Sequence, residues 1–194
     1  MPAAISPPPF KPLAETKLFQ QTTLGKHELS HRIAQAPLTR MRATKESDGV
    51  FVPNDLMLEY YSQRASKGGF QLTEATDVSH YASGYPGVPG MFTASQIQGW
   101  KRITDAVHAK GGIIFSQLWH TGRASPLSFR NGTQAISSSD ISISGKALDG
   151  TKYGDNPPRP ATLEEIQRIT GDFAQAAVNA IEAGFDGVEI HGMK

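Results

Sequence analysis

The sequence contains no cysteine among its 194 residues. This absence excludes a disulfide framework, a thiolate metal site and a cysteine nucleophile. An excess of charge of one sign is also lacking, because 19 lysine and arginine residues stand against 18 aspartate and glutamate residues, a formal net charge of +1. Such a chain has no bulk attraction for nucleic acid or for an anionic membrane surface. We therefore expect neither nucleic acid nor a membrane as a partner.

Long hydrophobic runs are missing too, since no segment approaches the roughly 18 apolar residues of a membrane span. Residues 1–13 show no basic start followed by an apolar stretch, so they do not read as a secretory signal. Together with the absence of cysteine, this predicts a cytoplasmic location. Several prolines within residues 1–16 predict a flexible, extended arm there, followed by one folded unit over residues 17–194.

Strand and helix patterns alternate along that folded unit. A hairpin is expected within residues 17–30, and apolar runs predict strands over residues 32–38, 70–77, 113–119 and 187–191. Helices are expected over residues 54–66, 93–111 and 162–184, with Asn54 as an N-cap and with capping boxes that begin at Thr93 and Thr162. This alternation predicts an α/β fold with right-handed connections and a parallel sheet.

Two parallel architectures compete for this pattern. A doubly wound nucleotide-binding fold has a glycine-rich turn after an early strand, whereas residues 39–42 contain no glycine. A (β/α) barrel needs no such turn and places its chemistry at the carboxyl ends of its strands. The sequence therefore favours the barrel.

Polar side chains stand at the carboxyl end of each predicted strand. These are Thr39, Glu74, Gln117 and His191. The carboxyl ends of parallel barrel strands meet at one rim, so we expect these side chains to converge there. Long loops follow two of the strands, at residues 78–92 and 120–161. Loops of this kind build specificity in barrel enzymes.

Spacing alone leaves other site chemistries open. His120 and His191 also lie near strand ends, but neither belongs to an HxH or HExxH spacing, so we expect no metal. Glu74 and Glu189 keep a two-carboxylate glycosidase as a remote alternative. A serine hydrolase is disfavoured, because the G-x-S-x-G pattern is absent.

Several segments together resemble one family, in order and spacing, from about residue 17 to residue 192. They are APLTRMRA at 36–43, YYSQRA at 60–65, TEAT at 73–76, GY at 84–85, VPG at 88–90, QLWHTGR at 117–123 and AGFDGVEIHG at 183–192. In these residues the chain resembles the Old Yellow Enzyme family of flavin-dependent ene-reductases. That family includes plant oxophytodienoate reductases and fungal ergot-alkaloid aldehyde reductases, so a role in specialised metabolism is expected.

The resemblance implies a (β/α)8 TIM barrel with non-covalently bound FMN, of which this chain supplies the amino-terminal hairpin and the first four β/α units. By position, Pro37, Leu38 and Thr39 would lie against the isoalloxazine ring. Ala75 would keep a position of close approach small, and Gln117 would pair with the pyrimidine edge, because an amide both donates and accepts.

The family reaction implies roles for two further residues. NADPH or NADH reduces the flavin, which then passes hydride to the β-carbon of an enone or enal. His191 would donate to the carbonyl oxygen, on which negative charge collects, and Trp119 would line the substrate pocket. The chain would thus be an FMN-dependent NAD(P)H oxidoreductase acting on the C=C bond of α,β-unsaturated carbonyl compounds.

The family pattern breaks after Gly192. The family has an asparagine three residues after the histidine and a tyrosine proton donor two residues beyond, whereas here Lys194 takes the asparagine position and no residue follows. An interrupted reading frame is therefore expected: an unspliced intron, a frameshift, an alternative isoform or an incorrect gene model. The alternative function is an inactive half-barrel, poor in FMN, that self-associates through the open edge of its fourth strand.

Overall fold

The computed structural model describes residues 12–130 and 132–192. Most of the expected arm, residues 1–11, lies outside the described residues. Two short 3-10 helices, η1 (Leu13–Glu15) and η2 (Lys17–Phe19), come first. Strands β1 (Thr22–Leu24) and β2 (His27–Leu29) then form an antiparallel hairpin, which confirms the hairpin predicted within residues 17–30.

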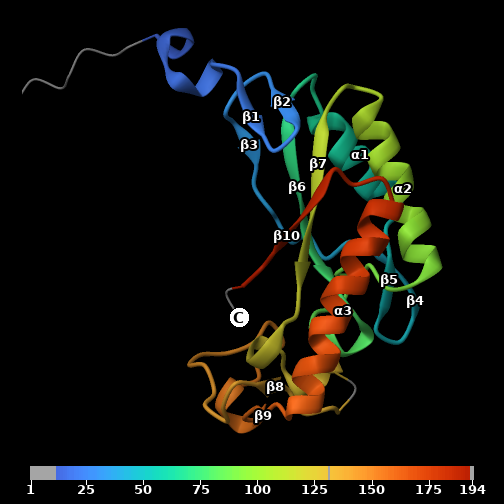
Figure 1. Cartoon of the computed structure of the whole chain (residues 1–194). Helices are drawn as coiled ribbons and strands as arrows, with labels where there is room; N and C mark the ends of the chain where they lie inside the picture. Colours follow the sequence, from blue (N-terminus) through green and yellow to red (C-terminus); the bar gives the residue numbers. More distant parts are fainter. Residues whose placement is uncertain (1–11, 131, 193–194) are drawn as a thin grey trace, which may run out of the picture.

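A four-stranded sheet forms the centre of the molecule, with the strand order β10-β7-β6-β3. Its strands are β3 (Ala34–Gln35), β6 (Phe70–Asp77), β7 (Ile113–Trp119) and β10 (Gly187–Ile190). All three pairings are parallel, as the alternation of strands and helices predicts. Figure 1 shows the strands side by side, with the chain entering at β3 and ending beyond β10.

The first sheet strand is much shorter than predicted. The pattern indicated residues 32–38, but β3 covers only Ala34–Gln35. This strand pairs with β6 alone, so it has a hydrogen-bonding neighbour on one side only. Pro37 then offers no backbone N–H to a sheet, and pairing ends before it.

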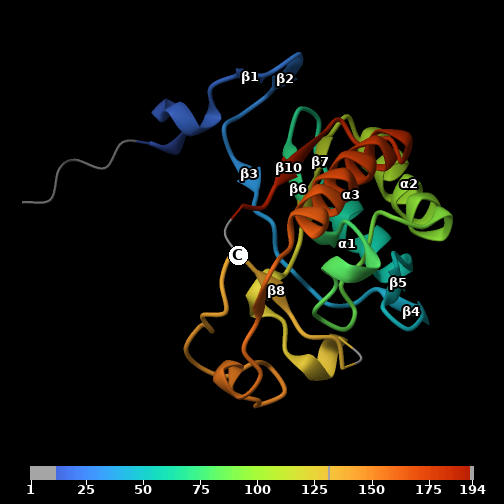
Figure 2. The same cartoon turned by 60° about the horizontal axis from the view of Figure 1, so that its bottom comes forward.

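Three helices cover one face of the sheet in both views (Figures 1 and 2). They are α1 (Asp55–Arg64), α2 (Ala94–His108) and α3 (Leu163–Glu182). The side chain of Asn54 accepts a hydrogen bond from the backbone of α1, and both predicted capping boxes are formed. The starts of the helices are therefore confirmed, because capping depends on a few neighbouring residues.

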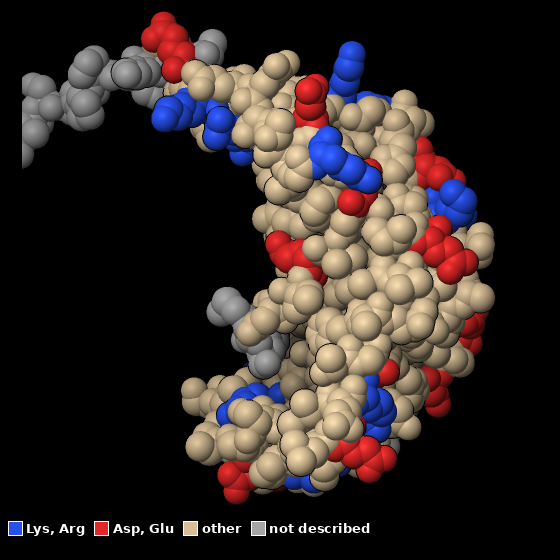
Figure 3. Space-filling model, in the orientation of Figure 1, with Lys and Arg blue, Asp and Glu red and all other residues tan. Residues whose placement is uncertain are grey.

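The apolar core lies between this helix layer and the sheet. Its largest fully buried members are Tyr61 on α1, Trp100 and Ile103 on α2, Ile114 and Leu118 on β7, and Met91 in the loop before α2. The opposite face of the sheet is concave, and the hollow opens toward the left in Figure 3. The four strands of the central sheet and the three helices do not close a barrel in the described part of the chain, so the fourth expected unit is present only as its strand.

Part of helix α3 is exposed where the sequence pattern predicts an apolar stripe. Residues Leu163, Ile166 and Ile181 of that stripe are 80%, 50% and 58% exposed. The buried face instead carries Ala176 and Ala180. Helix α3 packs on α2 at one flank, β10 ends the sheet, and in the described part of the chain no further helix covers the other flank.

Two further small sheets lie outside the central one. Strands β4 (Thr44–Ser47) and β5 (Val50–Val52) form a hairpin before α1, and β8 (Ile136–Ser137) pairs with β9 (Arg159–Pro160) inside the loop at 120–161. Neither was predicted, since these strands are short and β4 is entirely polar. No helix among residues 12–130 and 132–192 has the length and apolar character needed to cross a bilayer.

Candidate active site at the carboxyl edge of the sheet

One extra residue in strand β6 decides which side chains face the hollow. Leu72 pairs with Phe115 and Ala75 pairs with Gln117, so three steps along β6 correspond to two steps along β7. Side chains alternate between the faces of a strand, and an extra residue shifts that alternation by one. Ala75, and not Glu74, therefore lies beside Gln117.

Gln117 is tied to both neighbouring strands. Its side-chain nitrogen donates to Oε1 of Glu189 on β10 at 2.7 Å, and its backbone N–H donates to Oγ1 of Thr73 on β6 at 2.9 Å. The Gln117 side chain is largely buried. The amide is thus held in one place on the concave face, near the carboxyl end of β7.

Trp119 is the central aromatic residue of the site. Its indole N–H donates to Oδ1 of Asp77 at 2.6 Å, and its ring packs with buried Ala75 and Val88. The ring also stacks on Tyr85, with centroids 5.8 Å apart and an interplanar angle of 26°. Trp119 is only 4% exposed, so its orientation is fixed by neighbours on several sides.

His191 follows β10 directly and continues its direction. Its backbone N–H donates to the carbonyl oxygen of Leu118 at 2.9 Å, which extends the pairing of β10 with β7 by one bond. Its imidazole lies parallel to the Trp119 indole, with an interplanar angle of 3° and centroids 6.2 Å apart. The structure therefore brings together four predicted site residues: Ala75, Gln117, Trp119 and His191.

The segment after β3 carries the other three predicted residues, Pro37, Leu38 and Thr39. Leu38 is 54% exposed and Thr39 is also exposed, whereas Pro37 is half-buried. The next residue, Arg40, donates its backbone N–H to Oε2 of Glu74 at 3.2 Å. Glu74 thus anchors the end of this segment to strand β6.

Glu74 itself faces the helix layer. It is 1% exposed, and the hydroxyl of Tyr61 on α1 donates to its Oε1 while accepting a bond from its backbone N–H. Burial raises the pKa of Glu74 to about 7. Glu189 bonds to Gln117 on the concave face, so these two carboxyl groups do not face a common substrate. The glycosidase arrangement is therefore not formed.

The described histidines form no metal-binding cluster, although His27 and His108 both approach Asp186. His120 is half-buried, its Nδ1 accepts the backbone N–H of Gly122, and burial lowers its pKa to about 4. Residues 27–31 read HELSH, an HExxH spacing that the sequence reasoning overlooked, but His27–Leu29 is strand β2 and not part of a helix. In the described part of the chain, no three His, Asp or Glu side chains cluster as metal ligands would.

Two neighbours of the site escaped the sequence reasoning. Asp77 ends β6 and is fully buried, and this burial raises its pKa to about 8. Tyr85 lies in the loop after β6, and its hydroxyl donates to the carbonyl oxygen of Ala124 at 2.8 Å. The pair GY at 84–85 was noted only as part of a family motif. The sequence did carry a signal for Tyr85, because an aromatic residue within a glycine- and proline-rich loop at the rim is a candidate for contact with a ligand.

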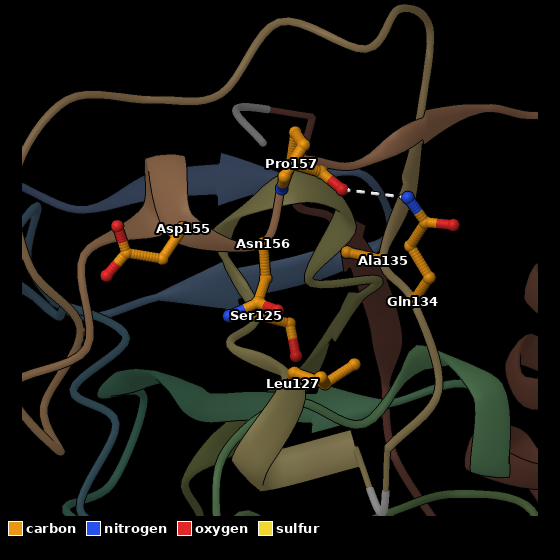
Figure 4. Close-up of a pocket in the computed structure, with 7 residues that line it drawn as sticks. All are labelled: Ser125, Leu127, Gln134, Ala135, Asp155, Asn156 and Pro157. Carbon is orange, nitrogen blue, oxygen red and sulfur yellow. Dashed lines mark hydrogen bonds between the residues drawn. The ribbon is translucent and has the colours of Figure 1, made fainter.

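A separate cavity of about 240 Å³ lies in the loop between β7 and α3 (Figure 4). Ser125 and Asn156 line it, and the side chain of Gln134 donates to the carbonyl oxygen of Pro157 at its rim. None of the predicted site residues lines this cavity. It adjoins Ala124, the residue that anchors Tyr85.

The concave face fits one side of a flat, hydrogen-bonding ring such as a flavin. Ala75 leaves space beside the amide of Gln117, which presents a donor and an acceptor to a pyrimidine edge. Trp119 and His191 form an adjoining aromatic wall. The donor set on this face is therefore compatible with FMN.

Comparison with known proteins agrees with this reading. The model of the NADH:flavin oxidoreductase / NADH oxidase family matches residues 17–194. The flavin oxidoreductase hxnT of Emericella nidulans is 61% identical over 175 residues, which are 90% of this chain and 45% of the relative. The 12-oxophytodienoate reductase 1 of Oryza sativa subsp. japonica is 48% identical over 180 residues, 92% of this chain and 45% of the relative.

A solved structure shows the same arrangement of elements. The Old Yellow Enzyme homologue from Zymomonas mobilis superposes with a TM-score of 0.78 and 42% identity, over 90% of this chain and 48% of that chain. The chain thus spans about half the length of the relatives that it matches. The Old Yellow Enzyme resemblance drawn from the motifs is confirmed, and the chain belongs to the NADH:flavin oxidoreductase / NADH oxidase family.

Proposed function

We propose that this chain supplies active-site residues of an FMN-dependent NAD(P)H oxidoreductase that reduces the C=C bond of α,β-unsaturated carbonyl compounds. The observation that carries the proposal is the convergence of Gln117, Trp119 and His191 on one face of two adjacent strands, beside Ala75. The names of two relatives, a flavin oxidoreductase and a 12-oxophytodienoate reductase, support the same reaction class.

Three residues hold the cofactor in this proposal. When bound, FMN supplies hydride transfer from the nicotinamide to the substrate carbon. Gln117 binds the pyrimidine edge, and the bond to Glu189 orients its amide. The small side chain of Ala75 lets the ring approach the sheet, and the exposed hydroxyl of Thr39 bonds near the reactive edge.

His191 acts on the substrate. Negative charge develops on the carbonyl oxygen as the β-carbon receives hydride, and a donor fixed at that oxygen lowers the barrier by about 3 kcal/mol. The imidazole is well placed for this role because the stacked indole of Trp119 fixes its plane. Trp119 also excludes water from the reacting atoms.

A chimera tests the proposal. This chain is joined to the carboxyl-terminal half of the Emericella nidulans relative, since the two proteins are 61% identical over the shared part. We expect a protein that retains FMN after desalting and, under anaerobic conditions, turns over NADPH or NADH only when a cyclic enone is added as the electron acceptor. His191→Ala should lower kcat by about 100-fold and leave FMN retention unchanged.

Gln117→Leu should weaken FMN binding at least about tenfold, because the hydrogen-bonding groups of the flavin's pyrimidine edge would then face an apolar side chain and stay unpaired. The matched control is Gln63→Leu, whose side chain is exposed on α1 and bonds only within that helix. Turnover of NADPH or NADH without enone under anaerobic conditions, or a Gln117→Leu chimera that holds FMN as tightly as its parent, would contradict the proposal. The 194-residue chain alone should retain little FMN, since many family barrels grip phosphate with loops after strands seven and eight.

A further inference from the structure

Two successive contacts lead from a buried carboxyl group to His191. Asp77 accepts the indole N–H of Trp119 at 2.6 Å, and Trp119 lies parallel to His191 within 3°. Asp77 is itself held on both sides of its backbone. Its N–H donates to Pro89 and its carbonyl oxygen accepts from Met91, each at 2.9 Å. The carboxyl therefore sits on a rigid base.

The other tryptophan of the chain shows that an indole N–H needs no carboxyl partner. Trp100 is fully buried in the core, and its N–H donates to the backbone carbonyl oxygen of Gly90 at 3.1 Å. A buried carboxyl is a more costly acceptor than a carbonyl, because burial disfavours its charged form. Trp119 nevertheless bonds to a carboxyl group, and this bond is shorter than that of Trp100. We therefore infer that the carboxyl group orients the Trp119 indole as well as satisfying its N–H.

The surroundings of Asp77 support that requirement. The side chain of Ser83 and the guanidinium of Arg130 both lie close enough to Asp77 to lower its pKa, against the effect of burial. Arg130 in turn donates to the carbonyl oxygen of Ser83 at 3.1 Å. The acceptor of the Trp119 N–H is thus fixed by a small buried polar network.

We propose that Asp77 is a positioning residue that fixes the indole plane of Trp119 and, through the stacked rings, the imidazole plane of His191. The consequence for catalysis rests on the proposed function, in which His191 donates to the substrate carbonyl. Stacking between two aromatic rings is a weak interaction, so the indole can hold the imidazole parallel only while the indole itself cannot turn. The bond from the indole N–H to Asp77 opposes rotation of the indole about its side-chain torsions.

The first test uses the 194-residue chain and needs neither FMN nor an enone. The ring protons of His191, assigned by NMR with His191→Ala, should be shifted by the ring current of Trp119. Asp77→Leu removes the acceptor and should reduce that shift, whereas Asp77→Asn keeps a side-chain oxygen and should preserve most of it. In a Trp100→Phe background, where Trp119 is the only tryptophan, Asp77→Leu should also weaken the near-ultraviolet circular dichroism.

The matched control is Glu74→Gln. Glu74 lies on the same strand and is as deeply buried, but it faces the helix layer and bonds to Tyr61. This substitution should leave the His191 signal unchanged. If Asp77→Leu does not fold, Asp77→Ala removes the acceptor and keeps the indole, and it should reduce the His191 shift. An unchanged His191 shift in every folded variant that lacks the N–H bond would overturn the proposal.

The second test separates this inference from the proposed function. In the active chimera, Asp77→Leu should lower kcat by about 10- to 100-fold with FMN retention unchanged, since a small misplacement of a donor is costly. A chimera without enone reductase activity would refute the proposed function, whereas the NMR result would still decide the role of Asp77. Full activity of the Asp77→Leu chimera would overturn the catalytic consequence.

Discussion

Glu74→Gln is expected to make the protein more stable at pH 8. The carboxyl of Glu74 is 1% exposed, and burial raises its pKa from the ordinary 4.5 to about 7. The folded state therefore binds a proton more tightly than the unfolded state. Stability from this group is complete below pH 4.5 and is lost as the pH rises through 7. Glutamine does not titrate, so the variant should not show this loss.

The size of the effect follows from the two pKa values. Each pKa unit corresponds to about 1.4 kcal/mol, so ionisation of Glu74 costs the folded state about 3 kcal/mol above pH 7. Glutamine can keep both contacts, because its oxygen can accept from Arg40 and its amide can donate to the Tyr61 hydroxyl. We therefore expect a small difference between the two proteins at pH 5 and a gain of about 2–3 kcal/mol for the variant at pH 8.

Urea unfolding at pH 5 and pH 8, followed by far-ultraviolet circular dichroism, measures this difference directly. Asp77 is present in both proteins, so its own raised pKa cancels in the comparison. A variant that loses stability by the same amount at both pH values would show that Glu74 contributes only through its hydrogen bonds. That result would refute the reasoning from burial.

Three further predictions concern local structure and association. Thr162→Ala removes the oxygen that accepts the backbone N–H of Glu165 and should cost about 1 kcal/mol in the same urea assay, whereas mid-helix Thr170→Ala should cost less. Gly87→Ala should destabilise more than Gly150→Ala, because both have positive φ but only at Gly87 would a Cβ meet backbone, 2.4 Å from the Met41 oxygen. Size-exclusion chromatography of the 194-residue chain should show dimers or larger species, since β3 and β10 leave open sheet edges, and a monomer at every concentration would contradict this.

The sequence predicted those features that depend on neighbouring residues. Asn54, Thr93 and Thr162 cap their helices as expected, because a cap requires only the first turn of the helix. The bounds of β6 and β7 were also predicted correctly, at residues 70–77 and 113–119. Strand β3 was overestimated, because a run of residues does not show whether a second neighbouring strand will pair with it.

The family motifs also identified the residues of the concave face. Ala75, Gln117, Trp119 and His191 come together there, whereas Glu74, which its strand-end position had also placed at this rim, bonds to Tyr61 in the helix layer. The roles assigned to them, and to Pro37, Leu38 and Thr39, remain proposals for the experiments above. Asp77 was missed because its partner, the Trp119 indole, is 42 residues away in the sequence.

The sequence by itself determined the alternation of strands and helices, the helix caps and the family. Only the tertiary structure decided which way the polar residues of β6 point. A strict alternation from Leu72 would have placed Glu74 on the concave face, but the extra residue before Ala75 turns Glu74 toward Tyr61 and Ala75 toward the hollow. The direction of a side chain depends on strand pairing, and pairing is set by residues on another strand. Without the added residue in β6, Glu74 and Glu189 would both lie on the concave face, as a glycosidase requires. With it, Ala75 takes the place of Glu74, and the face fits a flavin.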